Sequence, residues 1–178
     1  NTDTQHDSYV TYLSARASDI DLYSLDVIWT AEFARAGWIV ELPDGFFDPD
    51  EFLTGPVRSV TWNGGVYAVP WFTDAGVLYY RKDLLEQAGI PVPETWDDLR
   101  AACESVAEPN DLEGFVWQGA RYEGLVCNFL EFLWGVGGTL DNETVLERPD
   151  EAVRRVTEAL ELMKSFIDDG ITPKGVLT

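Results

Sequence analysis

Residues 61–95 constrain the fold of this chain more than any other segment does. They place the turn signal Asn63-Gly64 between two runs that favour β structure, and this pattern predicts a β-hairpin. An apolar run at 77–80 has the composition of a further strand and leads into a short helix that should end at Gly89. A hairpin, an extended segment and a helix in this order indicate that the chain crosses here from one structural unit into another.

Helices and strands are expected to alternate along most of the chain, which is the order of an α/β domain. Hydrophobic spacing, capping residues and turn signals predict helices at 6–17, 30–36, 82–88, 96–107, 121–134 and 149–168, a further short helix from Asp48 towards Val57, and strands at 20–25, 77–80 and 115–117. Gly37 and Gly170 are expected to end two of these helices. At 178 residues the chain is long enough for one large domain or two small lobes with a sizeable core.

The charge of the chain narrows the classes of partner. Its 32 acidic and 12 basic residues give a net charge of −20, whereas phosphate backbones are bound by basic surfaces. Nucleic-acid binding is therefore not expected, and contact with anionic lipid surfaces is disfavoured. No apolar run is long enough to span a bilayer. The acidic surface is interpreted as a means of solubility, including at high salt.

The two cysteines, Cys103 and Cys127, lack the spacing of a metal-binding pair, and the chain has a single histidine. Neither a zinc site nor any other metal or cofactor is expected. Both cysteines fall at apolar positions of predicted helices. A disulfide between them in an oxidising compartment and two buried thiols are both open interpretations.

Aromatic rings with an acid or an amide nearby lie at the ends of three predicted β runs. In open α/β sheets, ligands bind outside the carboxyl ends of the strands, so these positions are candidates for a binding site. The candidate residues are Asp26, Trp29 and Glu32 at the first run, Trp71, Phe72 and Asp74 at the second, and Gln118, Tyr122 and Glu123 at the third.

This combination of side chains suits a sugar. The C–H faces of a pyranose pack on aromatic rings, and its hydroxyl groups donate to carboxylates or exchange hydrogen bonds with amides. Each hydrogen bond to an ionised partner is worth about 1.5–3 kcal/mol. Structural roles stay open beside this hypothesis: Asp26 can cap a helix, Trp71 and Phe72 can be core residues, and Asp74 can belong to a turn.

Three segments carry a resemblance to a known family. They are LDVIWTAEFARAGWIVEL at 25–42, NGGVYAVPWFTDAGVLYYRKDLLEQAGIPVPETWDDL at 63–99 and GFVWQGARYEGLVCNFLEFLWGVGG at 114–138. In these segments the chain resembles the extracellular solute-binding proteins of sugar ABC transporters (family 1), the group that includes the maltose- and trehalose/maltose-binding proteins. The motif WQGARYEGLVCNFLE is most similar to the trehalose/maltose branch.

The resemblance implies a periplasmic-binding-protein-like fold, in which two α/β lobes enclose a cleft and a hinge closes over the sugar. Residues 1–74 would form the N-terminal lobe without its first strand, 75–81 the hinge or crossover, and 82–178 the first part of the second lobe. The fold would then be incomplete in this chain. By resemblance, the sugar contacts are expected at Asp26, Trp29, Phe72, Asp74, Gln118 and Tyr122, with Glu32 and Glu123 beside them.

The expected function is binding, not catalysis. The protein would capture a small oligosaccharide, an α-glucoside such as maltose or trehalose, and deliver it as a monomer to the membrane permease of an ABC transporter. It would work in the extracellular or periplasmic space, as a membrane-anchored lipoprotein in its full length. Two alternatives remain. A glycoside hydrolase needs two carboxyl groups about 5–9.5 Å apart and could draw them from Asp26, Asp74 and Glu123. A carbohydrate-binding or adhesion module would bind sugar without transport.

Overall fold

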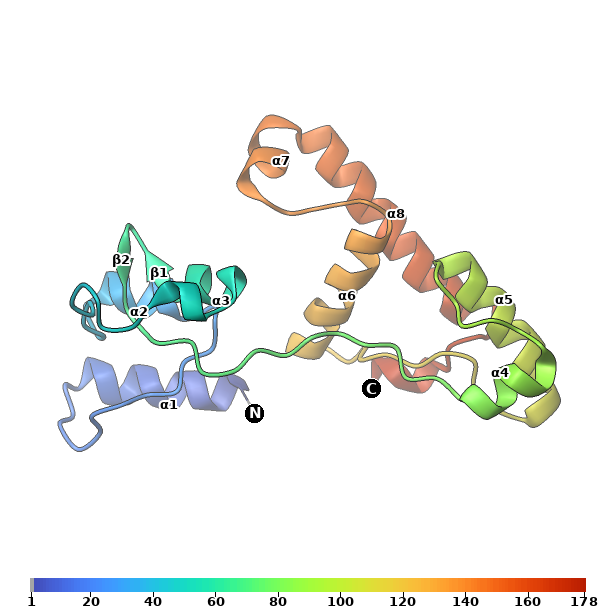
Figure 1. The fold of residues 1–178 in the computed structure, drawn as a ribbon, viewed down its shortest axis with the longest axis horizontal. Coiled ribbons are helices and arrows are strands. Elements are labelled where there is room, and N and C mark those ends of the chain that lie inside the picture. The colour runs from blue at the N-terminus through green and yellow to red at the C-terminus, as the bar shows by residue number, and fades with distance from the viewer. Residues whose placement is uncertain (1) are drawn as a thin grey trace. The chain divides into compact units, whose positions relative to one another are not determined.

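The computed structural model describes residues 2–178, and the chain divides into two compact units (Figure 1). The first unit ends at Ala75 and the second runs from Gly76 to Thr178. The division falls within the segment 75–81 that the sequence predicts as a crossover, although the assignment of the units to two lobes of a binding protein stays a prediction.

The helices and strands of the first unit are α1 (Thr2–Ser14), α2 (Thr30–Ala36), η1 (Pro49–Glu51), α3 (Thr54–Ser59), β1 (Thr61–Trp62) and β2 (Gly65–Val66). Those of the second are α4 (Lys82–Ala88), α5 (Trp96–Val106), η2 (Glu108–Asn110), α6 (Glu123–Gly135), α7 (Asn142–Glu147), α8 (Pro149–Asp168) and η3 (Lys174–Leu177).

The first unit has an aromatic core between α1 and α2. Phe33 on α2 is fully buried, and its ring lies 6.1 Å from that of Trp29 and 5.5 Å from that of Trp38. Tyr9 of α1 reaches the same cluster, with its ring 6.0 Å from Trp29. Gly37 ends α2 in the left-handed conformation (φ 69°) and donates its N–H to the carbonyl of Ala34, as the sequence predicts.

The predicted hairpin is confirmed. β1 and β2 pair antiparallel, with Thr61 opposite Val66. The two turn residues, Asn63 (φ 50°) and Gly64 (φ 87°), both have positive φ, as a tight hairpin turn requires. Asparagine and glycine are the residues that take this conformation at low cost, so the turn follows from the local sequence.

The second unit is built around two buried phenylalanines, Phe132 on α6 and Phe166 on α8, whose ring centres are 6.2 Å apart. Trp96, the first residue of α5, stacks on Phe132 with the ring centres 4.2 Å apart and the planes nearly parallel. Ala159 and Met163 complete the buried face of α8, which has the spacing of three and four residues that an amphipathic helix needs.

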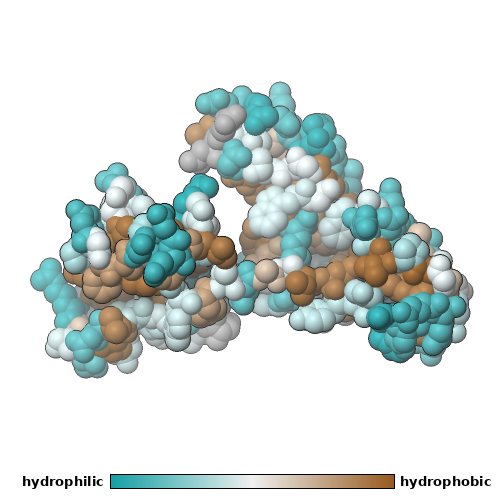
Figure 2. Space-filling view, in the orientation of Figure 1, coloured by the Kyte–Doolittle hydropathy of each residue, from teal (hydrophilic) through white to brown (hydrophobic). Residues whose placement is uncertain are grey.

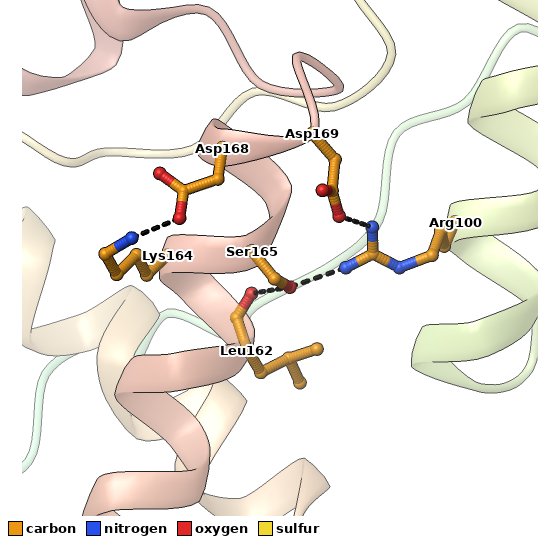
Figure 3. A network of polar contacts seen from close by, with 6 residues as sticks. All are labelled: Arg100, Leu162, Lys164, Ser165, Asp168 and Asp169. Atoms are coloured by element: carbon orange, nitrogen blue, oxygen red, sulfur yellow. Dashed lines mark hydrogen bonds and ion pairs between the residues drawn. The ribbon is translucent and has the colours of Figure 1, made fainter.

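A polar contact joins α5 to the end of α8 in the second unit (Figure 3). The guanidinium of Arg100 donates to Asp169 at 2.5 Å and to Ser165 at 2.5 Å, and it lies 4.7 Å from the centre of the Phe166 ring. The Ser165 hydroxyl in turn donates to the carbonyl of Leu162 at 2.7 Å. Arg100 therefore fastens the two helices by an ion pair, a hydrogen bond and a cation–π contact at one place.

The capping box predicted at the start of α5 is present. The Thr95 hydroxyl accepts the N–H of Asp98, and the Asp98 carboxylate accepts the N–H of Thr95, each at 3.1 Å. The hydrogen bonds from Thr95 and from the backbone of Glu94 hold the pKa of Asp98 below its usual value. This reciprocal pair satisfies N–H groups that the first turn of the helix leaves free.

The strands predicted at 20–25, 77–80 and 115–117 are wrong. In the part of the chain that the structure describes, the only strand pair is β1 with β2, and these three segments are extended or irregular. An extended segment becomes a strand only when a neighbouring backbone pairs with it. At the third segment, the N–H groups of Gly114 and Phe115 both donate to the single carbonyl of Ile171, which makes no ladder. The side chains of 77–80 are exposed, and Figure 2 shows hydrophobic side chains on the surface of the second unit.

Several helix bounds also differ from the prediction. The segment after Asp48 forms η1 and then α3 in place of one helix, because Asp48 caps only a single turn, accepting the N–H of Asp50 at 3.0 Å. α1 runs over Thr2–Ser14 and α6 over Glu123–Gly135, each displaced from its expected bounds, and α7 was not predicted. None of the helices among the described residues has both the length and the apolar character to cross a membrane.

Both cysteines of the second unit are free thiols. Cys103 is buried on α5, where burial raises the pKa of its thiol, and it lines an apolar pocket of about 290 Å³. Cys127 lies on α6 and is exposed. The structure therefore has no disulfide between them, and the other open interpretation, two buried thiols, holds for Cys103 and not for Cys127.

Candidate functional site

The nine residues predicted to contact a ligand are divided between the two units. Six belong to the first unit, namely Asp26, Trp29, Glu32, Trp71, Phe72 and Asp74, and three to the second, namely Gln118, Tyr122 and Glu123.

Trp29 is a core residue of the first unit. It is 5% exposed, and its ring lies 5.3 Å from His6 and 6.0 Å from Tyr9, both on α1. The indole thus holds α1 against the start of α2. Other rings of this unit pack against the indole. The part of Trp29 in ligand binding stays a prediction.

Glu32 and Asp26 have structural partners near Trp29. Glu32 on α2 lies 2.9 Å from Nε2 of His6, and this hydrogen bond is the largest cause of the raised pKa of the imidazole. Asp26 accepts the N–H of Ile28 on its carboxylate at 3.3 Å and that of Trp29 on its carbonyl at 3.0 Å. Asp26 therefore shapes the turn that enters α2, but it is not the cap of that helix, because Trp29 is the N-cap and no side chain accepts a hydrogen bond there.

Trp71 and Phe72 are the most open aromatic pair of the candidate set. They are 82% and 72% exposed, and their ring centres are 5.7 Å apart at an interplanar angle of 70°. Neither ring is a core residue of the first unit. Asp74 follows two residues later and is also exposed, so that two open rings and a carboxylate lie within four consecutive residues.

Gln118 and Tyr122 form a direct pair in the second unit. The Tyr122 hydroxyl donates to Oε1 of Gln118, and Tyr122 is the extended residue that precedes α6 (φ −160°). Both side chains are exposed, as is Glu123 on the first turn of α6, where the helix dipole favours an acid. The phenol, the amide and the carboxylate lie together at the start of α6 and present both donors and acceptors.

Gly124 permits this close pairing. A Cβ atom at this buried glycine would overlap Oε1 of Gln118 and would lie 2.5 Å from the hydroxyl oxygen of Tyr122. Any other residue would therefore displace the pair. The sequence does not identify Gly124, because the requirement arises from a contact across the loop before α6 and not from the backbone angles of the glycine.

Two further polar residues of α6 support Gln118 and were also missed. Asn128 accepts the backbone N–H of Gln118 on Oδ1 at 2.7 Å. Its Nδ2 donates to Glu131 at 2.9 Å. The only signal available in the sequence is a polar pair spaced by three residues on an otherwise apolar helix. Such pairs are common on solvent-exposed helix faces and do not by themselves indicate a site.

The chain matches one family and several of its members. The family described as "Bacterial extracellular solute-binding protein" matches residues 2–177. A probable ABC transporter-binding protein of Deinococcus radiodurans is 36% identical over 137 residues, which cover 73% of this chain and 32% of the relative. The diacetylchitobiose binding protein DasA of Streptomyces coelicolor is 28% identical over 125 residues, or 67% of this chain and 28% of the relative.

Solved structures show the same likeness. The structure described as maltose-bound T. maritima MalE3 is 47% identical, with a TM-score of 0.82, over 98% of this chain and 45% of that one. The GacH receptor of Streptomyces glaucescens, solved unliganded and with acarbose, is 27% identical, with a TM-score of 0.74, over 94% and 42%. The predicted periplasmic-binding-protein-like α/β fold class is confirmed, and the chain spans less than half the length of the proteins that it matches.

Proposed function

Because the chain belongs to the family of bacterial extracellular solute-binding proteins, we propose that the protein binds a small oligosaccharide, an α-glucoside such as maltose or trehalose. In this proposal the two units belong to the two lobes of a binding protein, with 75–81 as the hinge. The bound sugar is passed to the membrane permease of an ABC transporter. The protein works as a monomer outside the cytoplasm, and a lipid anchor holds it at the membrane.

The open ring pair of Trp71 and Phe72 is the observation that carries this proposal. Burying an aromatic side chain contributes roughly 1.5–3 kcal/mol. Trp71 and Phe72 are 82% and 72% exposed, so a ligand that covers both rings gains this free energy of burial twice. A pyranose offers apolar C–H faces that such rings can cover. Asp74, two residues beyond Phe72, supplies an acceptor for the hydroxyl groups at the rim of the ring.

The second unit supports the same ligand class. Tyr122 donates one hydrogen bond to Gln118, so a phenol and an amide lie side by side at the start of α6. A sugar hydroxyl can replace either partner, because the phenol both donates and accepts and the amide does the same. In the proposal, closure of the hinge selects the arrangement in which both units contact the sugar.

The relatives support binding and not turnover. One relative is described as a diacetylchitobiose binding protein, and one similar solved structure is described as maltose-bound. The same carboxylates would serve differently in a hydrolase, where one must remain protonated and the pair must flank a glycosidic bond.

Titration of the full-length protein with maltose and trehalose, with a glucose assay on the same samples, tests the proposal. Saturable binding without released glucose is expected, together with a thermal shift that grows with ligand concentration. A ligand at 100 times its dissociation constant stabilises a protein by about 2.7 kcal/mol. Release of glucose would favour the hydrolase, and the absence of both binding and release would contradict the proposal.

A further inference from the structure

A chain of side-chain contacts runs along α6 from the Gln118–Tyr122 pair to Gly76, the first residue of the second unit. Tyr122 donates to Gln118, the backbone N–H of Gln118 donates to Asn128 at 2.7 Å, and Asn128 donates to Glu131 at 2.9 Å. The carboxylate of Glu131 then occupies the space beside Gly76. These residues are separated by up to 55 positions in the sequence, so the fold and not the local chain brings them together.

The contact at Gly76 is close enough to forbid a side chain there. A Cβ atom at Gly76 would overlap one carboxylate oxygen of Glu131 and would lie 2.7 Å from its carboxyl carbon. A free glutamate could swing away at little cost. Glu131 is instead partly buried and held by Nδ2 of Asn128, so that moving the carboxylate breaks a charge-assisted hydrogen bond.

Asn128 is the member of this chain that only an amide can replace. It accepts an N–H with one end and donates to a carboxylate with the other. Aspartate would keep the first bond and place two carboxylates against each other, and leucine would keep neither. The amide therefore transmits the position of the Gln118 backbone to the position of the Glu131 carboxylate.

From these contacts we infer that Asn128 and Glu131 are positioning residues that couple the sugar-contacting pair, Gln118 and Tyr122, to the backbone at Gly76, where the chain enters the second unit. This inference rests on the proposed function, because it assigns the sugar to Gln118 and Tyr122. A ligand that displaces Tyr122 from Gln118 shifts the Gln118 backbone, and the shift passes through Asn128 and Glu131 to Gly76. Coupling of this kind is commonly worth a five- to 150-fold change in affinity, about 1–3 kcal/mol.

The test uses the full-length protein, with maltose as the probe and four variants. Asn128→Asp removes the donor to Glu131. The double variant Asn128→Asp with Glu131→Gln restores the contact in the opposite direction, since the new amide donates to the new carboxylate. Gly76→Ala displaces Glu131 directly. The control is Asn110→Leu, because Asn110 lies in the same unit, is exposed and makes one local bond to Val106.

Two readouts are taken for each variant. We expect Asn128→Asp and Gly76→Ala to raise the dissociation constant for maltose at least about fivefold. The double variant should return to within about twofold of the wild type, and Asn110→Leu should not change it. The second readout is the Gly76 amide signal of sugar-free protein labelled with ¹⁵N-glycine. Its chemical shift should change in Asn128→Asp, return to the wild-type value in the double variant and equal the wild-type value in the control.

The outcomes separate this inference from the proposed function. If the wild type binds no sugar, the proposed function fails, and the Gly76 signal still decides whether the contacts form a coupled chain. If maltose binds but Asn128→Asp leaves both readouts unchanged, the inference is overturned. It is also overturned if the double variant does not recover the affinity, because a merely structural loss would not be repaired by reversing one hydrogen bond.

Discussion

The Nε2 atom of His6 on α1 lies 2.9 Å from a carboxylate oxygen of Glu32 on α2. Asp7 adds a second, longer contact at 3.7 Å from Nδ1. The hydrogen bond from Glu32 is the largest cause of the raised pKa of this imidazole, against a smaller lowering by burial. The charged pair joins the two helices whose rings form the core of the first unit, so its charge state bears on how firmly α1 is held.

The stability of the first unit should therefore depend on pH through His6. A histidine whose folded pKa is raised contributes stabilisation that is complete below its unfolded pKa of 6.5 and is lost as the pH rises through the folded value. His6 is the single histidine of the chain, so its NMR titration can be read without assignment of others. We expect a pKa above 6.5 that falls towards 6.5 in Glu32→Gln. An unchanged pKa in that variant would refute the pairing.

Loss of Arg100 should destabilise the second unit. Its guanidinium contacts Asp169, Ser165 and the Phe166 ring, and its side chain is only 23% exposed. We expect Arg100→Ala to lower the free energy of unfolding by about 1–3 kcal/mol in urea titrations. Arg81→Ala is the matched control, because Arg81 is an exposed arginine that pairs with Asp83 at the surface. Its effect should stay within about 0.5 kcal/mol, and equal losses in the two variants would contradict this packing.

Truncating a side chain on the buried face of α6 should lower the free energy of unfolding strongly, and truncating one on the exposed face should lower it only slightly. Phe132 is 1% exposed and stacks on Trp96, whereas Trp134 is 60% exposed. Phe132→Ala is expected to cost about 3–5 kcal/mol of unfolding free energy, because it opens a cavity in the core. Trp134→Ala should cost less than about 1 kcal/mol. A larger loss in Trp134→Ala than in Phe132→Ala would show that α6 is turned differently.

Replacing Gly124 should separate stability from sugar affinity. Alanine in a helix is favoured over glycine by up to about 1 kcal/mol, yet a methyl group at this position overlaps the Gln118–Tyr122 pair. We expect Gly124→Ala to melt within about 2 °C of the wild type and to bind maltose at least about fivefold more weakly. Gly55→Ala on α3 is the control, since a Cβ there meets nothing within 4 Å. If both variants bind maltose as the wild type does, the close pairing over Gly124 has no part in recognition.

Features set by neighbouring residues could be predicted from the sequence, and features set by distant contacts could not. The turn at Asn63 and the glycine that ends α2 follow from backbone preferences, and the capping box at Thr95 follows from a motif of four residues. The strands at 20–25 and 77–80 were wrong, because a strand exists only with a partner that the local sequence does not reveal.

In the candidate site, too, the features that depend on contacts with distant residues could not be predicted from the sequence. Trp71 is exposed and its role as a contact residue stays a prediction, whereas Trp29 is covered by His6 and Tyr9, which lie at least 20 positions earlier in the sequence. Neither periodicity nor spacing indicates that cover. Asn128 was missed for a related reason, since its importance lies in bonding to the backbone of Gln118 across a loop.

The most direct measurement is the calorimetric titration of maltose into the full-length protein and its Trp71→Ala, Asp74→Ala and Trp62→Ala variants. Trp62 serves as the control, because it lies in the hairpin with its ring 6.0 Å from that of Tyr67. If the open rings and the acid beside them hold the sugar, Trp71→Ala and Asp74→Ala should each bind at least about tenfold more weakly, or about 1.4 kcal/mol. Trp62→Ala should stay within about twofold. Equal losses in all three variants, or a wild type that gives no binding heat with any α-glucoside, would contradict the account.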